Sequence, residues 1–312
     1  EERDAAARTA RLPSMALRAA RAALERGAPV LVQVPRRGYL PSVACARCRT
    51  IARCRHCVGP LSLSDRDAEG AVCRWCGRID PALRCRRCGG DAIRAVVVGA
   101  RRTAEELGRA FPGVTVITSA GDAVHPEIGP GPALVVATPG AEPRAPAGYG
   151  AALLLDTWSM LGRQDLRAAE DTLRRWMAAA AQVHARADGG VVAVVADSSI
   201  PTVQALVRWD PVGHAEAELD GRTAVGFPPA VHMAAVDGAS DAVAALIAAA
   251  ALPEDADVLG PVDLPPGVRR PPGAGAHAIR MLIRVRRDEG LALAGALRDA
   301  TAVCSARHDN DA

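Results

Sequence analysis

Four Cys-x-x-Cys pairs constrain this chain more than any other feature of its sequence. Nine of the 312 residues are cysteines, and eight of them form these pairs between positions 45 and 88, with gaps of five, fifteen and eight residues. Two residues between two cysteines allow both thiolates to face one cation, and two such pairs complete a tetrahedral four-sulfur site. A closed site of this kind leaves no position for water or substrate, so its metal is structural. We therefore expect two structural Zn²⁺ ions per chain, held by Cys45, Cys48, Cys54, Cys57, Cys73, Cys76, Cys85 and Cys88.

The same cysteines have alternative interpretations. Disulfides would suit a small secreted scaffold, but the N-terminus shows no hydrophobic signal core and the pairs occupy a short part of a large chain. Iron–sulfur ligation is the other alternative. For zinc, the five- and eight-residue gaps are short for bringing neighbouring pairs face to face, which favours a nested arrangement, while an interleaved one competes with it. Nesting joins Cys45, Cys48, Cys85 and Cys88 in one site and Cys54, Cys57, Cys73 and Cys76 in the other.

The composition excludes several classes of function. All 38 basic residues are arginine, and a phosphate-binding loop of the Walker A type needs a lysine, so this chain contains no such loop. The formal net charge is only +3, so the chain as a whole has no strong positive field that would attract nucleic acid. No apolar run reaches membrane-spanning length. We expect a cytoplasmic monomer that is not bound to a membrane.

Arginines gather around the cysteine pairs. Guanidinium groups on a small rigid knob suit contacts with DNA phosphates, and solvated arginines are the alternative interpretation. We expect DNA contacts from Arg36, Arg37, Arg47, Arg53, Arg55, Arg74, Arg86 and Arg87. Six arginines near the C-terminus fit a strand-binding face or a solvated edge equally well: Arg269, Arg270, Arg280, Arg284, Arg286 and Arg287.

Short apolar runs alternate with helical patterns on both sides of the cysteines. Continuous β-branched runs separated by helices indicate an α/β fold with a parallel sheet and helices on both faces. The expected strands are 29–35, 95–99, 114–118, 133–138, 151–156 and 190–197, and the expected helices include 14–26, 101–110 and 165–184. After about residue 215 the pattern changes to that of a small α+β domain. We expect an α/β domain of residues 1–44 and 91–215, an inserted two-zinc module of residues 45–90 and a C-terminal domain of residues 216–312.

Four stretches resemble a known family, primosomal protein N′, the replication-restart DNA helicases called PriA. They are the runs VPRRGYLPSVACARCRTIARCRHC (34–57), FPGVTVI (111–117), LLLDTWSMLGRQDLRAAED (153–171) and RTAVGFPPAV (222–231), the last of which resembles the entry to the family's C-terminal domain. In that family an RRGY-like segment ends a strand of the second RecA-like helicase lobe, and the two-zinc module follows it directly. The resemblance implies that this chain comprises lobe 2, the zinc insertion and the C-terminal domain, with lobe 1 before residue 1.

The chain departs from the family at its nucleotide motif. The family sequence Q-x-x-G-R-x-G-R supplies an arginine finger to the γ-phosphate, whereas this chain reads QVHARADGG (182–190). Gln182 and Arg186 remain, and Gly189 stands at the finger position. A finger contributes about 10³–10⁵ in rate. We therefore expect a degenerate lobe that does not hydrolyse ATP, and ATP is doubtful as a cofactor.

The resemblance implies partners and a place of action. We expect binding to forked or single-stranded DNA and association with the nucleoid. We also expect contacts with single-stranded DNA-binding protein and with primosome and helicase-loading proteins. Two alternatives stay open: an active ATP-dependent 3′→5′ DNA helicase whose lobe 1 lies on the N-terminal part, and a zinc-stabilised protein-interaction module without DNA affinity.

Overall fold

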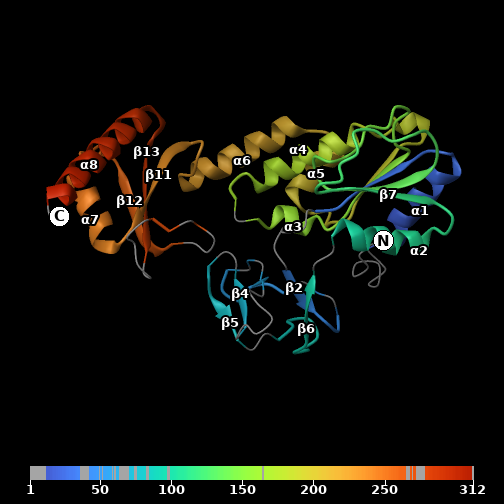
Figure 1. Ribbon diagram of the computed structural model, residues 1–312, viewed down its shortest axis with the longest axis horizontal. Helices are drawn as coiled ribbons and strands as arrows, with labels where there is room; N and C mark the ends of the chain where they lie inside the picture. The colour runs from blue at the N-terminus through green and yellow to red at the C-terminus, as the bar shows by residue number, and fades with distance from the viewer. Residues whose placement is uncertain are drawn as a thin grey trace. The chain divides into compact units, whose positions relative to one another are not determined.

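The chain forms two compact units, Glu1–His214 and Ala215–Ala312. A computed structural model describes residues 12–35, 42–48, 50, 52–57, 59, 61–62, 70–73, 76–81, 84–96, 99–163, 165–264, 268, 270–271 and 278–310. Figure 1 shows the course of the chain. Within the described ranges, no helix is both long enough and apolar enough to cross a membrane.

A five-stranded parallel sheet is the centre of the first unit. Its strand order is β10-β9-β1-β8-β7, and every pair of neighbours runs parallel. The strands are β1 (Val30–Gln33), β7 (Thr115–Ser119), β8 (Ala133–Ala137), β9 (Ala151–Leu154) and β10 (Val191–Val194). All residues of β1, β8 and β9 are buried. This burial on both faces explains why these strands are continuous apolar runs, and it confirms the predicted α/β class.

Helices cover both faces of this sheet. On one face lie α1 (Ser14–Glu25) and α2 (Ala100–Ala110), and on the other α4 (Ala168–Ala180) and α5 (Pro201–Arg208). Val30 and Val32 of β1 contribute to the α1 face, whereas Leu31 contributes to the other, as side-chain alternation along a strand requires. The shorter helices of this unit are α3 (Trp158–Leu161) and the 3₁₀ turn η1 (Arg186–Asp188), and α6 (Pro211–Val225) follows α5.

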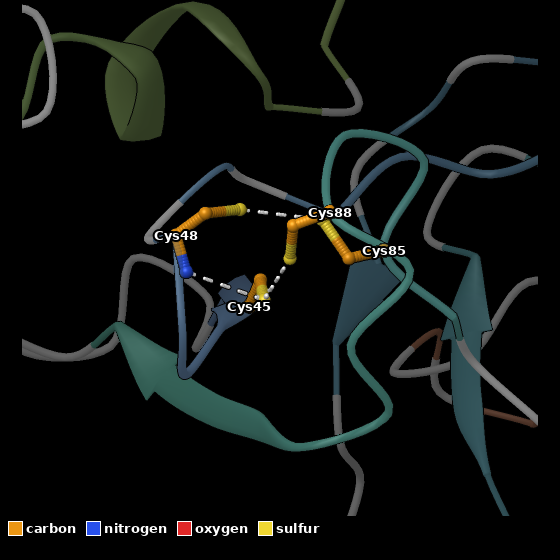
Figure 2. Close-up of side chains that lie close together, drawn as sticks. All are labelled: Cys45, Cys48, Cys85 and Cys88. Atoms are coloured by element: carbon orange, nitrogen blue, oxygen red, sulfur yellow. Dashed lines mark hydrogen bonds between the residues drawn. The ribbon is translucent and has the colours of Figure 1, made fainter. Parts of the chain in front are cut away.

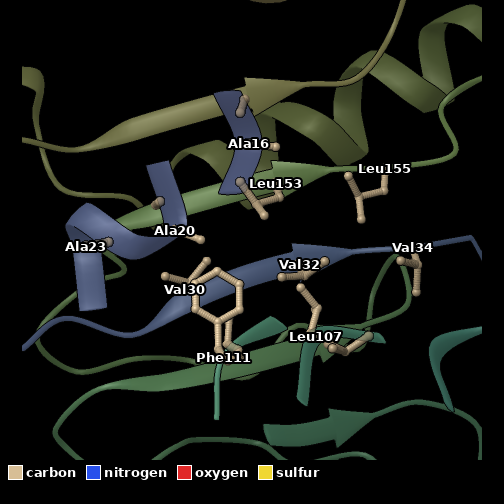
Figure 3. Packing of buried hydrophobic residues seen from close by; sticks show 14 of the residues in the cluster. Ala16, Ala20, Ala23, Val30, Val32, Val34, Leu107, Phe111, Leu153 and Leu155 are labelled. Atoms are coloured by element: carbon tan, nitrogen blue, oxygen red, sulfur yellow. The ribbon is translucent and has the colours of Figure 1, made fainter. Parts of the chain in front are cut away.

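Small residues allow α1 to approach the sheet closely. Ala16, Ala20 and Ala23 are fully buried and lie at helical spacing along one side of α1, over the sheet residues in Figure 3. Before β9, Gly150 continues the same contact, because a Cβ at this position would lie 2.9 Å from the Ala23 Cβ and 2.6 Å from the Ala28 Cβ. The alanine-rich composition therefore serves close packing in this layer.

The cysteine pairs belong to a second, antiparallel sheet with the order β5-β4-β3-β2-β6. Its strands are β2 (Ser42–Cys45), β3 (Leu61–Ser62), β4 (Ala71–Cys73), β5 (Ile79–Asp80) and β6 (Ile93–Val96). The prediction that residues 95–99 add a strand to the parallel sheet is wrong. Instead β6 pairs antiparallel with β2, with Val43 opposite Ala95. A short apolar run does not specify by itself which sheet it joins, because its partner is distant in sequence.

The second unit is a small α+β structure. Its antiparallel sheet has the order β11-β13-β12, from β11 (Val231–Gly238), β13 (Ile279–Arg286) and β12 (Asp257–Asp263). Two helices, α7 (Ser240–Ala249) and α8 (Gly290–Asn310), follow β11 and the 3₁₀ turn η2 (Arg287–Glu289). Ile283, Val285 and Leu293 form its buried core. The predicted change to an α+β pattern is confirmed.

Candidate metal centres

Each cysteine pair forms the same kind of turn. In every pair the backbone N–H of the first cysteine donates to the carbonyl oxygen five residues later, at 2.8–2.9 Å. The four donor–acceptor pairs are Cys45–Thr50, Cys54–Gly59, Cys73–Arg78 and Cys85–Gly90. In the last two pairs a glycine with positive φ follows the second cysteine (Gly77 and Gly89, both 71°), a conformation that other residues adopt at a cost. These turns aim both thiols of a pair in one direction.

The first and fourth pairs meet at what we call the outer site: Cys45, Cys48, Cys85 and Cys88. Figure 2 shows the four side chains converging on one point. The Sγ atoms of Cys45 and Cys88 are 3.5 Å apart, and those of Cys48 and Cys85 are 3.4 Å apart. Four sulfurs at about 2.3 Å from a tetrahedral Zn²⁺ are separated by roughly 3.8 Å, so this set is close to the size of a single-ion site.

The second and third pairs meet at the inner site: Cys54, Cys57, Cys73 and Cys76. Here the Sγ atoms of Cys54 and Cys76 are 3.7 Å apart, and those of Cys57 and Cys73 are 3.3 Å apart. In both sites all four sulfurs lie within 4.8 Å of one another. The structure therefore groups the eight thiols in the nested order and not in the interleaved one.

The sulfur separations also bear on the disulfide alternative. A disulfide bond joins two sulfurs at about 2.03–2.05 Å. The closest sulfurs given above are 3.3 Å apart, and all nine cysteines are free thiols. The described residues thus offer two four-thiol clusters that could hold metal ions, and the ninth cysteine, Cys304, belongs to neither.

Hydrogen bonds prepare some of these thiols for a cation. The hydroxyl and the backbone N–H of Thr50 lower the pKa of Cys48 to about 6. The backbone N–H groups of Cys57 and His56 lower the pKa of Cys54 to about 6 against the opposing effect of burial. Stabilised thiolates favour metal binding, because the thiolate and not the thiol is the ligand.

The pKa of Cys88 shifts in the opposite direction. The Gly90 N–H lowers its pKa, but hydrogen bonds with Cys48 and Cys45 and the cost of burial together raise the pKa of Cys88 to about 11. A proton on Cys88 can thus be shared with neighbouring thiolates, and it would be released when a cation takes its place.

The arginines expected to contact DNA fall into three groups. Arg36, Arg37 and Arg74 lie outside the described residues. Arg47, Arg86 and Arg87 are exposed, and all three lie on the two turns of the outer site. Arg55 is exposed but forms an ion pair with Asp80 at 3.4 Å, and Arg53 is partly buried.

Residues 182–190, where the chain departs from the family's nucleotide motif, make contacts that the sequence did not predict. Gly189 has a left-handed φ of 80°, and its carbonyl oxygen accepts a 2.8 Å hydrogen bond from Arg26 Nη2. A Cβ at residue 189 would lie 3.3 Å from the Arg26 guanidinium carbon. The carbonyl of Gln182 accepts from Tyr149 N–H, and Arg186 is exposed on η1. No sequence signal links Arg26 with Gly189, because 163 positions separate them.

Three of the six C-terminal arginines are paired with carboxylates, and Arg269 lies outside the described residues. Arg280 donates two 2.7 Å hydrogen bonds to Asp237, and these bonds lower the pKa of Asp237. Arg284 donates to Asp257 at 2.8 Å. Arg286 donates to Asp288 at 3.0 Å. These ion pairs support the solvated-edge interpretation for the three arginines, because the neighbouring carboxylates neutralise their charge.

Fold and site together define a class: an α/β protein with a parallel sheet, a cysteine module with two candidate metal sites, and a separate α+β unit. Residues 223–311 match the family model described as "Primosomal protein N C-terminal domain". The chain is 71% identical over 313 residues to the probable replication restart proteins PriA of Mycobacterium tuberculosis and Mycobacterium bovis, which is 98% of this chain and 48% of each relative. The replication restart protein PriA of Thermotoga maritima is 34% identical over 90 residues, 28% of this chain and 12% of that protein.

The chain therefore belongs to the PriA family of replication restart proteins. It spans about half the length of the curated relatives that it matches along nearly its whole extent.

Proposed function

We propose that this chain is the zinc-binding, DNA-contacting part of a replication restart protein that binds forked or branched DNA and supports primosome assembly without a working motor. One observation carries the proposal: eight thiols form two sets of the size of a zinc tetrahedron, and exposed arginines lie on the turns that hold one set. The relatives' name, replication restart protein, supports the cellular task.

Zinc suits the donor set better than the alternatives. Four thiolates without nitrogen or oxygen ligands are typical of structural Zn²⁺ sites or of iron–sulfur centres. With all four sulfurs within 4.8 Å of one another, each set has the size for one ion rather than for a multi-iron cluster. Bound zinc would supply cross-links between turns and no reaction step, because every coordination position is taken by sulfur.

DNA contact is assigned to the outer turns. Arg47, Arg86 and Arg87 present guanidinium groups to solvent on a scaffold that the metal makes rigid. Phosphate contacts of this kind do not read sequence, so recognition of a fork would depend on its shape. Single-stranded DNA-binding protein and helicase-loading proteins are the partners expected for this task, carried out by a monomer at the nucleoid in the cytoplasm.

The absence of a motor is inferred from the nucleotide motif. Gly189 offers no side chain at the arginine-finger position, and the Arg26 guanidinium packs where a side chain would start. Arg186, three residues earlier, is exposed at the start of the 3₁₀ turn η1, whereas Gly189 lies at the opposite end of that turn as its C-cap. An arginine finger is worth about 10³–10⁵ in rate, so its loss would reduce hydrolysis to background.

The test measures zinc content, fork binding and DNA-stimulated ATP hydrolysis on the full-length protein. We expect two equivalents of zinc, salt-dependent fork binding and hydrolysis at background. Hydrolysis at the rate of an ordinary helicase would show that the motor works. Zinc-loaded protein without fork affinity would favour a protein-interaction module instead.

A further inference from the structure

The inner and outer sites have different surroundings. Three inner cysteines belong to the hydrophobic core of the cysteine module, whereas no outer cysteine does. The members of this core are Val43, Cys54, Leu61, Ala71 and Cys73, with Ala52, Cys57 and Ile93 packed against them. The cysteines that would hold an ion at the inner site are therefore themselves part of the apolar core of this sheet.

The two sites also close loops of different length. The facing inner cysteines are 16 and 22 positions apart, and the facing outer cysteines are 37 and 43 positions apart. Because closure probability falls as about the 3/2 power of loop length, this difference alone favours the inner site by roughly threefold to fourfold.

Nesting makes closure of the outer site depend strongly on the inner one. With the inner site closed, the chain between Cys48 and Cys85 is shortened to six positions before Cys54 and nine after Cys76. With the inner site open, closing the outer site would have to restrain all the intervening residues. The coupling acts equally in both directions, but the inner site needs it less, because its own loops are shorter and three of its cysteines already belong to the core.

The antiparallel sheet β5-β4-β3-β2-β6 connects the two sites. The outer ligand Cys45 ends β2, and the same strand places Val43 in the core around the inner cysteines. Ala52 N–H donates to the Val43 carbonyl at 2.8 Å, and β3 pairs with both β2 and the Cys73 strand β4. Formation of the inner core therefore positions β2, and with it one half of the outer site.

We propose that the two sites load in a fixed order, in which the inner site binds metal first and independently and the outer site depends on it. This inference rests on the proposed zinc binding. On metal loss the order is reversed, so the outer ion leaves first. Since Arg47, Arg86 and Arg87 lie on the outer turns, loss of one ion disorders the arginine-bearing turns before the module core unfolds.

A matched pair of variants tests the order in the full chain. Cys48→Ser and Cys57→Ser remove the second cysteine of consecutive pairs, and both side chains are partly buried. We expect bound zinc, measured by atomic emission, to be about one equivalent in Cys48→Ser and none in Cys57→Ser. One equivalent in both variants, or none in Cys48→Ser, would overturn the order. Wild-type protein without zinc would instead overturn the proposed metal binding.

Release from the wild-type chain gives a second measurement that does not depend on how a variant folds. With a colorimetric chelator in excess, we expect two phases of about one equivalent each. Fork affinity should fall during the first phase, while the circular dichroism of the parallel-sheet unit stays constant. Release of both ions in one phase would contradict sequential loading.

Discussion

The exposed arginines of the outer site allow a quantitative prediction about DNA binding. Arg86 and Arg87 are adjacent, exposed and without an ion pair to any other described residue, so each can contact one phosphate. Replacing both with alanine removes two positive charges and no buried contact. We expect the double variant to keep its fold and zinc and to bind forks more weakly.

The size of the effect follows from counterion release. Each phosphate contact contributes about 0.9 to the slope of log affinity against log salt for duplex DNA, and about 0.7 for single strands. Loss of two contacts should reduce the slope by roughly 1.4–1.8. Between about 50 and 200 mM salt, the affinity deficit of the variant should therefore shrink by roughly sevenfold to twelvefold.

The assay is fluorescence anisotropy with a labelled fork over this salt range. The control is the double variant Arg286→Ala and Arg298→Ala, which removes the same charge from exposed residues that are paired with Asp288 and Asp299 at 3.0 and 3.2 Å. Its slope should equal that of the wild type. An unchanged slope for the Arg86 and Arg87 variant, or an equal loss in the control, would refute the distinction between unpaired and neutralised arginines.

Three further predictions concern stability, measured by urea unfolding. Arg280 lowers the folded-state pKa of Asp237, so the pair stabilises the second unit at pH values above the ordinary aspartate pKa of about 3.9. This stabilisation should be lost as the pH falls below that value. Asp237→Asn should not show this pH dependence. Leu153→Ala, at a fully buried core position, should cost about 2–5 kcal/mol, whereas Leu291→Ala, 91% exposed, should change stability by less than about 0.5 kcal/mol. Gly148→Ala should cost about 1–2 kcal/mol or more, because φ is 80° and the new Cβ would lie 2.5 Å from a histidine ring; a neutral result would show that the turn relaxes.

Local patterns were sufficient to predict the class of the fold. The strands 133–138 and 151–156 were recognisable because a strand buried on both faces must be apolar at every position. The run at 95–99 had the same appearance and was assigned to the wrong sheet, since its partner β2 lies some fifty positions earlier. The Arg26–Gly189 contact could not be predicted either, because a single hydrogen bond between distant residues produces no repeating pattern in the sequence.

The chemistry of the cysteines was determined by the sequence itself, because a two-residue gap allows two thiolates to face one cation. The eight ligands and the family resemblance at VPRRGY needed no coordinates for their recognition. Which turns face one another was decided only by the tertiary structure, since strand pairing among β2, β3, β4 and β6 brings the first turn to the fourth. The same holds for the arginines: their charge is in the sequence, but only the fold places an aspartate beside Arg280 and none of the described ones beside Arg86.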